Sequence, residues 1–339
     1  MLNANYSGRT SIKIYFQIIL TILFITWFSG NAGAACLFKG QNYYTENYSL
    51  ADSAFPRDKV VGNYSTTELY PSQTFVLACA GGNYGTTTAT VSDGQLSSGY
   101  TDVYQTGIPG IGIRFQLTPI GLTSSGTTFR TAPFATTTGS TTLATAIFNV
   151  KIDLVVTGTV QSGTATSLPT LSVKHQAYGS SGYTSYTLVL NPFTITAMTC
   201  QVSTSNISVP MATMTQGNFS EVNTVAGTRN FSIGLNSCPA GANIYVTLSD
   251  VSSPSNTSNI LSLSADSTAT GVAYQILYNS EPVNFGPSSS SAGTLNQWWF
   301  GQSTAGSMTI PLSARYIKTS ESIGLGTVNA LATFTLSYQ

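Results

Sequence analysis

The sequence predicts an all-β protein with two β-sandwich domains in tandem, and three observations support this fold class. First, short segments rich in Val, Ile, Thr and aromatic residues recur along the chain, for example at 110–117, 146–156 and 183–190. Second, stretches rich in Gly, Asn and Ser separate such segments, as at 80–84 and 178–182, and no segment has a convincing helical period. Third, 339 residues of which 42% are hydrophobic can form two packed cores.

Residues 1–34 have the features of a secretory signal peptide. Arg9 and Lys13 precede an apolar run over 14–28, and small residues at 32–34 offer a cleavage site. The run is shorter than the roughly 20 apolar residues that span a bilayer, so a cleaved signal is favoured over a membrane anchor. We therefore expect an exported mature chain without a membrane span.

Charged side chains are sparse, and this excludes some partners. Only 7% of the residues are charged, with 12 basic and 12 acidic side chains. Loss of Arg9 and Lys13 with the signal would leave a balance of 10 − 12 = −2. Such a chain is not drawn electrostatically to nucleic acid or to an anionic membrane surface.

The chain has four cysteines, Cys36, Cys79, Cys200 and Cys238. In an exported protein an even number predicts disulfides, and four cysteines allow three connectivities. One pair lies in each half of the chain, so we expect Cys36 to pair with Cys79 and Cys200 with Cys238. A zinc site is set aside because there is no Cys-x-x-Cys and only one histidine, His175.

The last residues, 326–339, have the pattern of a β-strand with one buried face. Apolar residues occupy every second position, and these are Val328, Ala330, Ala332, Phe334, Leu336 and Tyr338. A strand that closes the sequence without a following partner leaves a backbone edge and an apolar face to be covered from outside. We expect the other wall of this groove to be the first strand of the same domain, around 202–209.

This C-terminus resembles that of the pilin subunits assembled by the bacterial chaperone–usher pathway, in which a Gly precedes alternating apolar residues and a penultimate aromatic. Further similar phrases are 231–238 and 310–316. The resemblance implies an incomplete immunoglobulin-like fold over 200–339 that lacks its last strand. A periplasmic chaperone and then a neighbouring pilin subunit would donate that strand, at an outer-membrane usher. The implied groove residues are Val202, Ile207, Val209, Gly326, Val328, Ala330, Ala332, Phe334, Leu336, Tyr338 and Gln339.

The whole layout resembles that of two-domain fimbrial tip adhesins of the type 1 and type 3 kind. An opening cysteine, a β domain and then a pilin domain make up that layout, and 106–114 and 153–163 look like phrases of those adhesins. The resemblance implies a receptor-binding, lectin-like domain over 35–192, a linker over 193–199 and a pilin domain over 200–339. It also implies a place at the fimbrial tip on a Gram-negative cell.

The first domain holds aromatic and polar side chains in a turn-like context, which suits a host glycan and leaves a matrix-protein receptor open. Sugars present apolar C–H faces and many hydroxyls, so rings beside Asn and Asp can bind them. The alternative is that these tyrosines only pack in the sandwich. The candidates are Tyr43, Tyr44, Asn83, Tyr84, Asp102 and Tyr104.

No catalytic constellation stands out, so we expect neither an enzyme nor a cofactor. There is no Gly-x-Ser-x-Gly, no His-Glu-x-x-His and no phosphate-binding glycine loop. Two rival functions stay open. One is a minor pilin or adaptor without a receptor, and the other, weaker one is a secreted glycan hydrolase, for which the 12 scattered acidic residues single out no pair.

Overall fold

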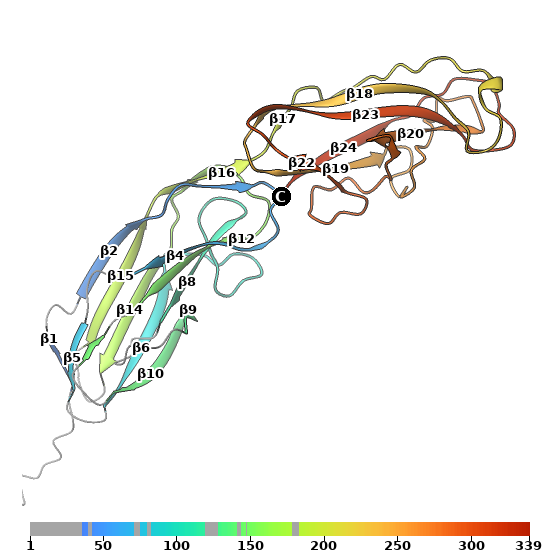
Figure 1. The fold of residues 1–339 in the computed structure, drawn as a ribbon. Helices are drawn as coiled ribbons and strands as arrows, with labels where there is room; N and C mark the ends of the chain where they lie inside the picture. The colour runs from blue at the N-terminus through green and yellow to red at the C-terminus, as the bar shows by residue number, and fades with distance from the viewer. Residues whose placement is uncertain are drawn as a thin grey trace, which may run out of the picture.

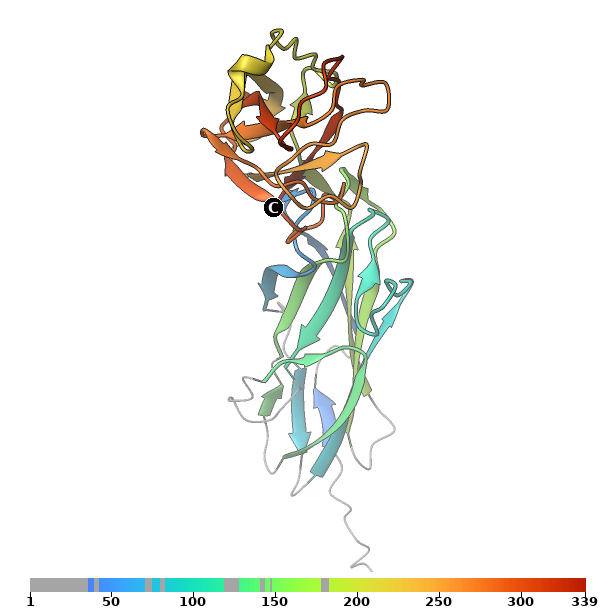
Figure 2. The same cartoon turned by 90° about the vertical axis from the view of Figure 1, so that its right-hand side faces the viewer.

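The computed structural model describes residues 36–39, 43–70, 75–79, 83–118, 128–140, 144–146, 148–177 and 183–339. The expected signal peptide lies outside these ranges. Two elongated β-sandwich domains are joined end to end, and the C-terminus lies at their junction (Figures 1 and 2). This confirms the predicted fold class. Within the described ranges, no helix has the length and hydrophobicity to cross a membrane.

The first domain packs two main sheets face to face. One has the order β10-β6-β14-β15-β2 and the other β4-β12-β8-β7, with β9 beside β8. Two small sheets, β1-β5-β11 and β13-β16-β3, complete it. The strands are β1 (Cys36–Lys39), β2 (Tyr43–Ser49), β3 (Ser53–Pro56), β4 (Gly62–Leu69), β5 (Phe75–Cys79), β6 (Asn83–Ser92), β7 (Tyr104–Gln105), β8 (Ile111–Leu117), β9 (Arg130–Thr131), β10 (Phe134–Ser140), β11 (Ala144–Ala146), β12 (Val150–Val156), β13 (Gly163–Ala165), β14 (Thr170–Ala177), β15 (Tyr183–Asn191) and β16 (Phe193–Met198).

Alternation of side chains explains how these strands build one core. Along β15 every second residue from Thr184 is buried, which places one face on the core and leaves the other in solvent. β12 is buried along nearly all its length because it lies between β4 and β8. Phe148 and Tyr186 meet edge to face inside, with ring centroids 5.1 Å apart.

The second domain is a smaller sandwich. Its sheets have the orders β17-β18-β23-β20-β21 and β22-β19-β24. A separate core fills the space between them. The elements are β17 (Gln201–Val202), the 3₁₀ turn η1 (Gln216–Asn218), β18 (Val225–Cys238), β19 (Asn243–Asp250), β20 (Val272–Tyr278), β21 (Glu281–Pro282), β22 (Trp298–Gln302), β23 (Gly306–Lys318) and β24 (Ala332–Tyr338).

Of the two expected disulfides, the structure describes one. Cys200 and Cys238 are joined by a disulfide at the start of the second domain. Cys36 and Cys79 lie directly opposite each other in the β1–β5 ladder. Their side chains lie outside the described part of the chain, so their pairing stays a prediction.

The segment 193–199, expected to be a linker, is different in the structure. Residues 193–198 form β16, which pairs antiparallel with β13 and parallel with β3. Phe193 and Ile195 are buried in the core of the first domain. Pro192 ends β15 as expected, but the alternation of apolar residues after it continues as a strand.

Candidate functional site

The C-terminal strand β24 has one paired edge and one open edge. It pairs antiparallel with β19, from Ala332 opposite Asp250 to Tyr338 opposite Ile244. No strand among the described residues pairs with its second edge. Gln339 and Asn243 exchange main-chain hydrogen bonds of 2.9 and 3.2 Å. Gln339 and Asn243 are therefore a bonded pair, and bonded and non-bonded pairs alternate along an antiparallel ladder. The odd-numbered residues of β24 thus bond to β19, and the even-numbered residues turn their N–H and C=O groups to the open edge.

The inner face of this C-terminal segment is only partly covered. Val328, Ala330, Ala332 and Phe334 are half-buried against the second core, whereas 329, 331 and 333 are exposed. Toward the end of the chain the face closes, and Tyr338 is 2% exposed. Its hydroxyl donates to the carbonyl of Cys200 at 3.2 Å, and burial raises the pKa of Tyr338. The uncovered apolar surface therefore lies mainly before Leu336.

The opposite wall is not the regular strand that the sequence suggested over 202–209. β17 covers only Gln201 and Val202, and the chain then runs without strand pairing to η1. Ile207 still packs on the second core, while Val202 is 37% exposed. Ser and Asn lie between these apolar residues, and such residues favour turns over regular strands.

A hollow of about 630 Å³ opens at the end of this groove, at the domain junction. Both domains line it, and Phe334 and Leu336 form part of its apolar wall. The remaining lining residues are Arg57, Asp58, Thr159, Cys200, Val202, Ser288, Ser289, Ser290, Thr335 and Tyr338. We call the open edge of β24, its half-buried face and this hollow the acceptor groove.

Gly326 lies where the chain enters the groove. A Cβ there would meet the main chain of the neighbouring segment, at 2.5 Å from the nitrogen of Ala269 and 2.6 Å from the carbonyl carbon of Thr268. Thr327 accepts main-chain hydrogen bonds from these same two residues, of 3.0 and 3.1 Å. The absence of a side chain at Gly326 therefore allows the close approach that positions the following apolar row.

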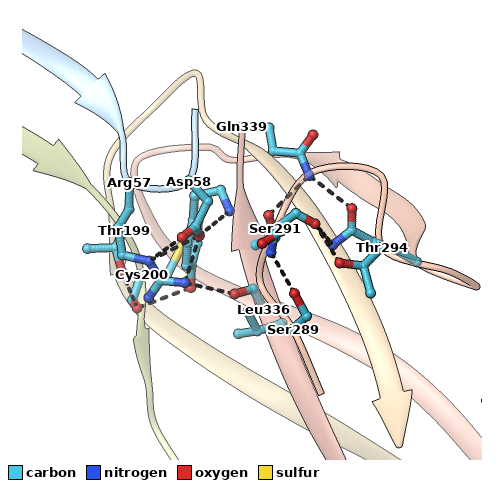
Figure 3. Close-up of polar contacts among 12 residues, drawn as sticks. Arg57, Asp58, Thr199, Cys200, Ser289, Ser291, Thr294, Leu336 and Gln339 are labelled. Atoms are coloured by element: carbon cyan, nitrogen blue, oxygen red, sulfur yellow. Dashed lines mark hydrogen bonds and ion pairs between the residues drawn. The ribbon is translucent and has the colours of Figure 1, made fainter. Parts of the chain in front are cut away.

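Gln339 is held beside the groove by its side chain. Its Nε2 donates to Oε1 of Gln297 and to Oγ of Ser337, both at 3.0 Å (Figure 3). Together with the main-chain exchange with Asn243, these bonds keep the end of the chain on β19. Gln339 thus fixes the strand on its paired edge and leaves the other edge open.

The structure does not bring the six candidate receptor residues together. Tyr43 and Tyr44 begin β2 and Asn83 and Tyr84 begin β6, so all four lie in strands instead of the expected loops. The side chains of Asn83 and Tyr84 lie outside the described part. Tyr104 is in the other sheet.

Of the four candidates whose side chains the structure describes, only Tyr43 is well exposed. Tyr104, in β7, is 7% exposed, and Tyr44 packs on the first core. Asp102 is half-buried, with its carboxylate 3.6 Å from the guanidinium of Arg114. Tyr43 is 60% exposed. Burial of Tyr104 and the ion pair of Asp102 are long-range effects that the turn-like sequence context did not reveal.

Tyr43 has neighbours that sequence reasoning missed. Its ring lies edge to face with Tyr183 at a centroid distance of 5.4 Å. The ammonium of Lys174 lies 4.0 Å from the centroid of the Tyr183 ring. These side chains come from β2, β15 and β14, and all three lie on the face of the sheet that points away from the core. We call Tyr43, Tyr183 and Lys174 the tyrosine patch.

His175 faces the opposite side of β14 and is structural. It is 2% exposed, and its Nδ1 lies 3.0 Å from Oγ1 of Thr87. Burial lowers the pKa of His175 to about 4, so the ring is neutral at ordinary pH. Within the described ranges, no group of three His, Cys, Asp or Glu side chains could hold a metal ion.

Comparisons with known proteins match two regions of the chain, and the second of these begins just before β16. Residues 192–339 match the model of the fimbrial protein family, and residues 55–179 match that of the MrkD-like receptor binding domain. The F17c-G fimbrial adhesin of Escherichia coli is 41% identical over 157 residues, which are 44% of this chain and 45% of that protein. The chain thus spans about half the length of the F17 adhesins that it matches. A fimbria adhesin protein of Klebsiella pneumoniae is 27% identical over 332 residues, which are 91% of this chain and 95% of that protein.

Two solved structures align with parts of this chain. The receptor binding domain of the adhesin MrkD1P of Klebsiella pneumoniae aligns with 50% of this chain and 99% of its own, at 22% identity and a TM-score of 0.35. The CupB6 tip adhesin from Pseudomonas aeruginosa aligns with 89% and 93%, at 16% identity and a TM-score of 0.34.

The matched regions are a region similar to a receptor-binding domain followed by one similar to a fimbrial protein domain. Together these matches support a resemblance to the chaperone–usher fimbrial tip adhesins.

Proposed function

We propose that the second domain joins this protein to a fimbria by accepting a β-strand from another protein. The open edge of β24 above a half-buried apolar row carries this proposal. A donor strand would pair with the free N–H and C=O groups and place alternate apolar side chains on Val328, Ala330, Ala332 and Phe334. Each large donor side chain buried contributes about 1.5–3 kcal/mol, so four or five contribute about 6–15 kcal/mol before ordering costs. This is comparable to the roughly 5–15 kcal/mol by which a domain is stable.

The order in which partners would bind follows from the missing strand of the second domain. A domain that lacks one strand is expected to aggregate unless a periplasmic chaperone supplies the strand first. A neighbouring pilin subunit would replace that strand at the outer-membrane usher. The second domain has no free extension before it to donate in turn, because β16 leads directly into Cys200. This supports a place at the fimbrial tip, on the surface of a Gram-negative bacterium.

A synthetic peptide tests strand acceptance. We would add a peptide of alternating Val and Thr, with a Lys at each end to limit self-association, to the full chain and follow its thermal unfolding. The matched control has the same residues with the alternation scrambled. The alternating peptide should raise the melting temperature of the second domain and the scrambled one should not. Equal effects of both peptides would contradict strand acceptance.

We further propose that the first domain binds a receptor, with the tyrosine patch as the candidate site. Exposed aromatic rings can stack on the apolar face of a sugar, and Lys174 and the neighbouring threonines can bond its hydroxyls. This favours a glycan over a matrix protein. The family is one of structural proteins, so no catalytic role is assigned.

A binding screen of the full chain on glycans and on collagen tests this second proposal. Tyr43→Ala and Tyr183→Ala should each weaken glycan binding about tenfold or more, as loss of one stacking ring does. Tyr70→Ala is the matched control, because Tyr70 is 69% exposed and follows β4 in the other sheet. If all three variants bound equally well, the patch would not be the site. Collagen binding without glycan binding would favour a protein receptor.

A further inference from the structure

The first domain already occupies one end of the open edge of β24. Arg57 and Asp58 form a turn directly after β3, and this turn lies against the end of β24 (Figure 3). The N–H of Asp58 donates to the carbonyl of Tyr338 at 2.9 Å, and the N–H of Tyr338 donates to the Asp58 carboxylate at 3.0 Å. Nη2 of Arg57 donates to the carbonyl of Leu336 at 2.9 Å. All three are groups of the open edge, because they belong to even-numbered residues.

The two side chains also fix each other. Arg57 donates from Nε and Nη2 to the Asp58 carboxylate, with a shortest distance of 2.7 Å. The Asp58 side chain is 3% exposed, and a carboxylate buried in this way is costly for the fold without a paired cation. The Arg57 guanidinium also lies 5.1 Å from the centroid of the Tyr338 ring. The turn thus meets the end of β24 through several directional contacts.

The turn is held firmly by its own domain. The N–H of Val160 donates to the carbonyl of Arg57 at 2.8 Å, and the N–H of Arg57 donates to the carbonyl of Met198 in β16 at 3.2 Å. Any rotation of the first domain therefore moves the turn relative to β24. The contact links the orientation of the first domain to the geometry of the acceptor groove.

We propose that the Arg57–Asp58 turn acts as a stop at the end of the acceptor groove. An inserted strand can pair with Ala332, Phe334 and the N–H of Leu336, and it must end before Tyr338, with its last residue in the hollow at the junction. The same contacts hold the first domain in one orientation. This inference rests on strand acceptance as the function of the groove, but the contact itself can be tested without a donor strand.

The first experiment measures hydrogen exchange of single amides by NMR in the full chain. Tyr338 should be protected without any peptide, whereas the amide of Phe334 should exchange rapidly. Asp58→Ala should speed exchange of Tyr338 by about tenfold or more, and Asp58→Asn, which keeps an acceptor oxygen, should not. The alternating Val/Thr peptide should protect Phe334 and Leu336 while Tyr338 stays dependent on Asp58.

The second experiment measures domain orientation by pulsed EPR, with spin labels at the exposed positions of Asn47→Cys and Glu221→Cys. The unmodified turn should give one narrow distance distribution, and Arg57→Ala with Asp58→Ala should broaden it. Glu68→Ala is the control, since it removes an ion pair with Lys151 of 2.8 Å within the first domain.

The outcomes separate the two proposals. A peptide that fails to bind would contradict strand acceptance, while protection of Tyr338 by Asp58 would still show the contact. A peptide that binds and makes Tyr338 protection independent of Asp58 would overturn the stop. An unchanged distance distribution in the double variant would overturn the orienting role.

Discussion

Truncation of the first domain before β16 is expected to unfold it. Phe193 and Ile195 are 2% and 0% exposed within the first core. Each buried side chain of this size contributes about 1.5–3 kcal/mol, so their loss removes about 3–6 kcal/mol. Domains are typically stable by roughly 5–15 kcal/mol, so little or no stability would be left. We therefore expect 35–199, and not 35–192, to be the unit that folds alone.

Expression of both fragments in an oxidising periplasm checks this. Urea unfolding and limited proteolysis should show 35–199 to be cooperative and resistant and 35–192 to be degraded. In the full chain, Phe193→Ala should destabilise the first domain by about 3–5 kcal/mol, because it leaves a cavity. Thr194→Ala, at the next and exposed position, should change stability by less than about 0.5 kcal/mol. If both fragments unfolded at the same urea concentration, the reasoning from burial would be refuted.

Three further predictions concern the groove, the buried histidine and the disulfide. Phe334→Asp should abolish chaperone capture in a periplasmic pull-down, because it places a carboxylate in the apolar groove, whereas Thr333→Asp, at an exposed position of the same strand, should be tolerated better; equal losses would contradict the groove. Since the pKa of His175 is about 4 when folded and near 6.5 when unfolded, the unfolded chain binds the proton more readily. The contribution of His175 to the free energy of unfolding should thus be fully present above pH 6.5 and fall by about 3 kcal/mol as the pH drops to 4. In urea titrations, His175→Gln should remove this pH dependence. Cys200→Ser with Cys238→Ser opens a loop of 38 residues and should cost about 4 kcal/mol; an unchanged midpoint in denaturant would exclude this.

The sequence was most informative where one local period decides the structure. The alternation from Val328 to Phe334 appears in the structure as alternating half-buried and exposed residues. The same rule applied to 193–198 would have shown β16, since Phe193, Ile195 and Ala197 also alternate. The preceding Pro192 suggested a connector instead. Proline ended β15 but did not prevent a new strand from starting at the next residue.

Contacts between distant segments could not be read from local patterns. Tyr183 meets Tyr43 because β15 pairs in parallel with β2, and a parallel pair depends on the order of strands in the whole sheet. One local signal does stand in the sequence, because Arg57 and Asp58 are adjacent opposite charges in a chain with only 7% charged residues.

That charge pair supplies what an apolar groove lacks. A row of alternating apolar residues accepts an alternating donor equally well after a slip of two positions, because the same face stays inward. The contacts of Arg57 and Asp58 with Leu336 and Tyr338 are directional and occur at one end only. These contacts block a donor strand from pairing with Tyr338, so they define where its last residue lies. A donor that is shifted away from this position by two residues loses main-chain hydrogen bonds to β24. The same contacts belong to a turn fixed by Val160 and Met198, so register of the donor and orientation of the receptor domain depend on one buried ion pair.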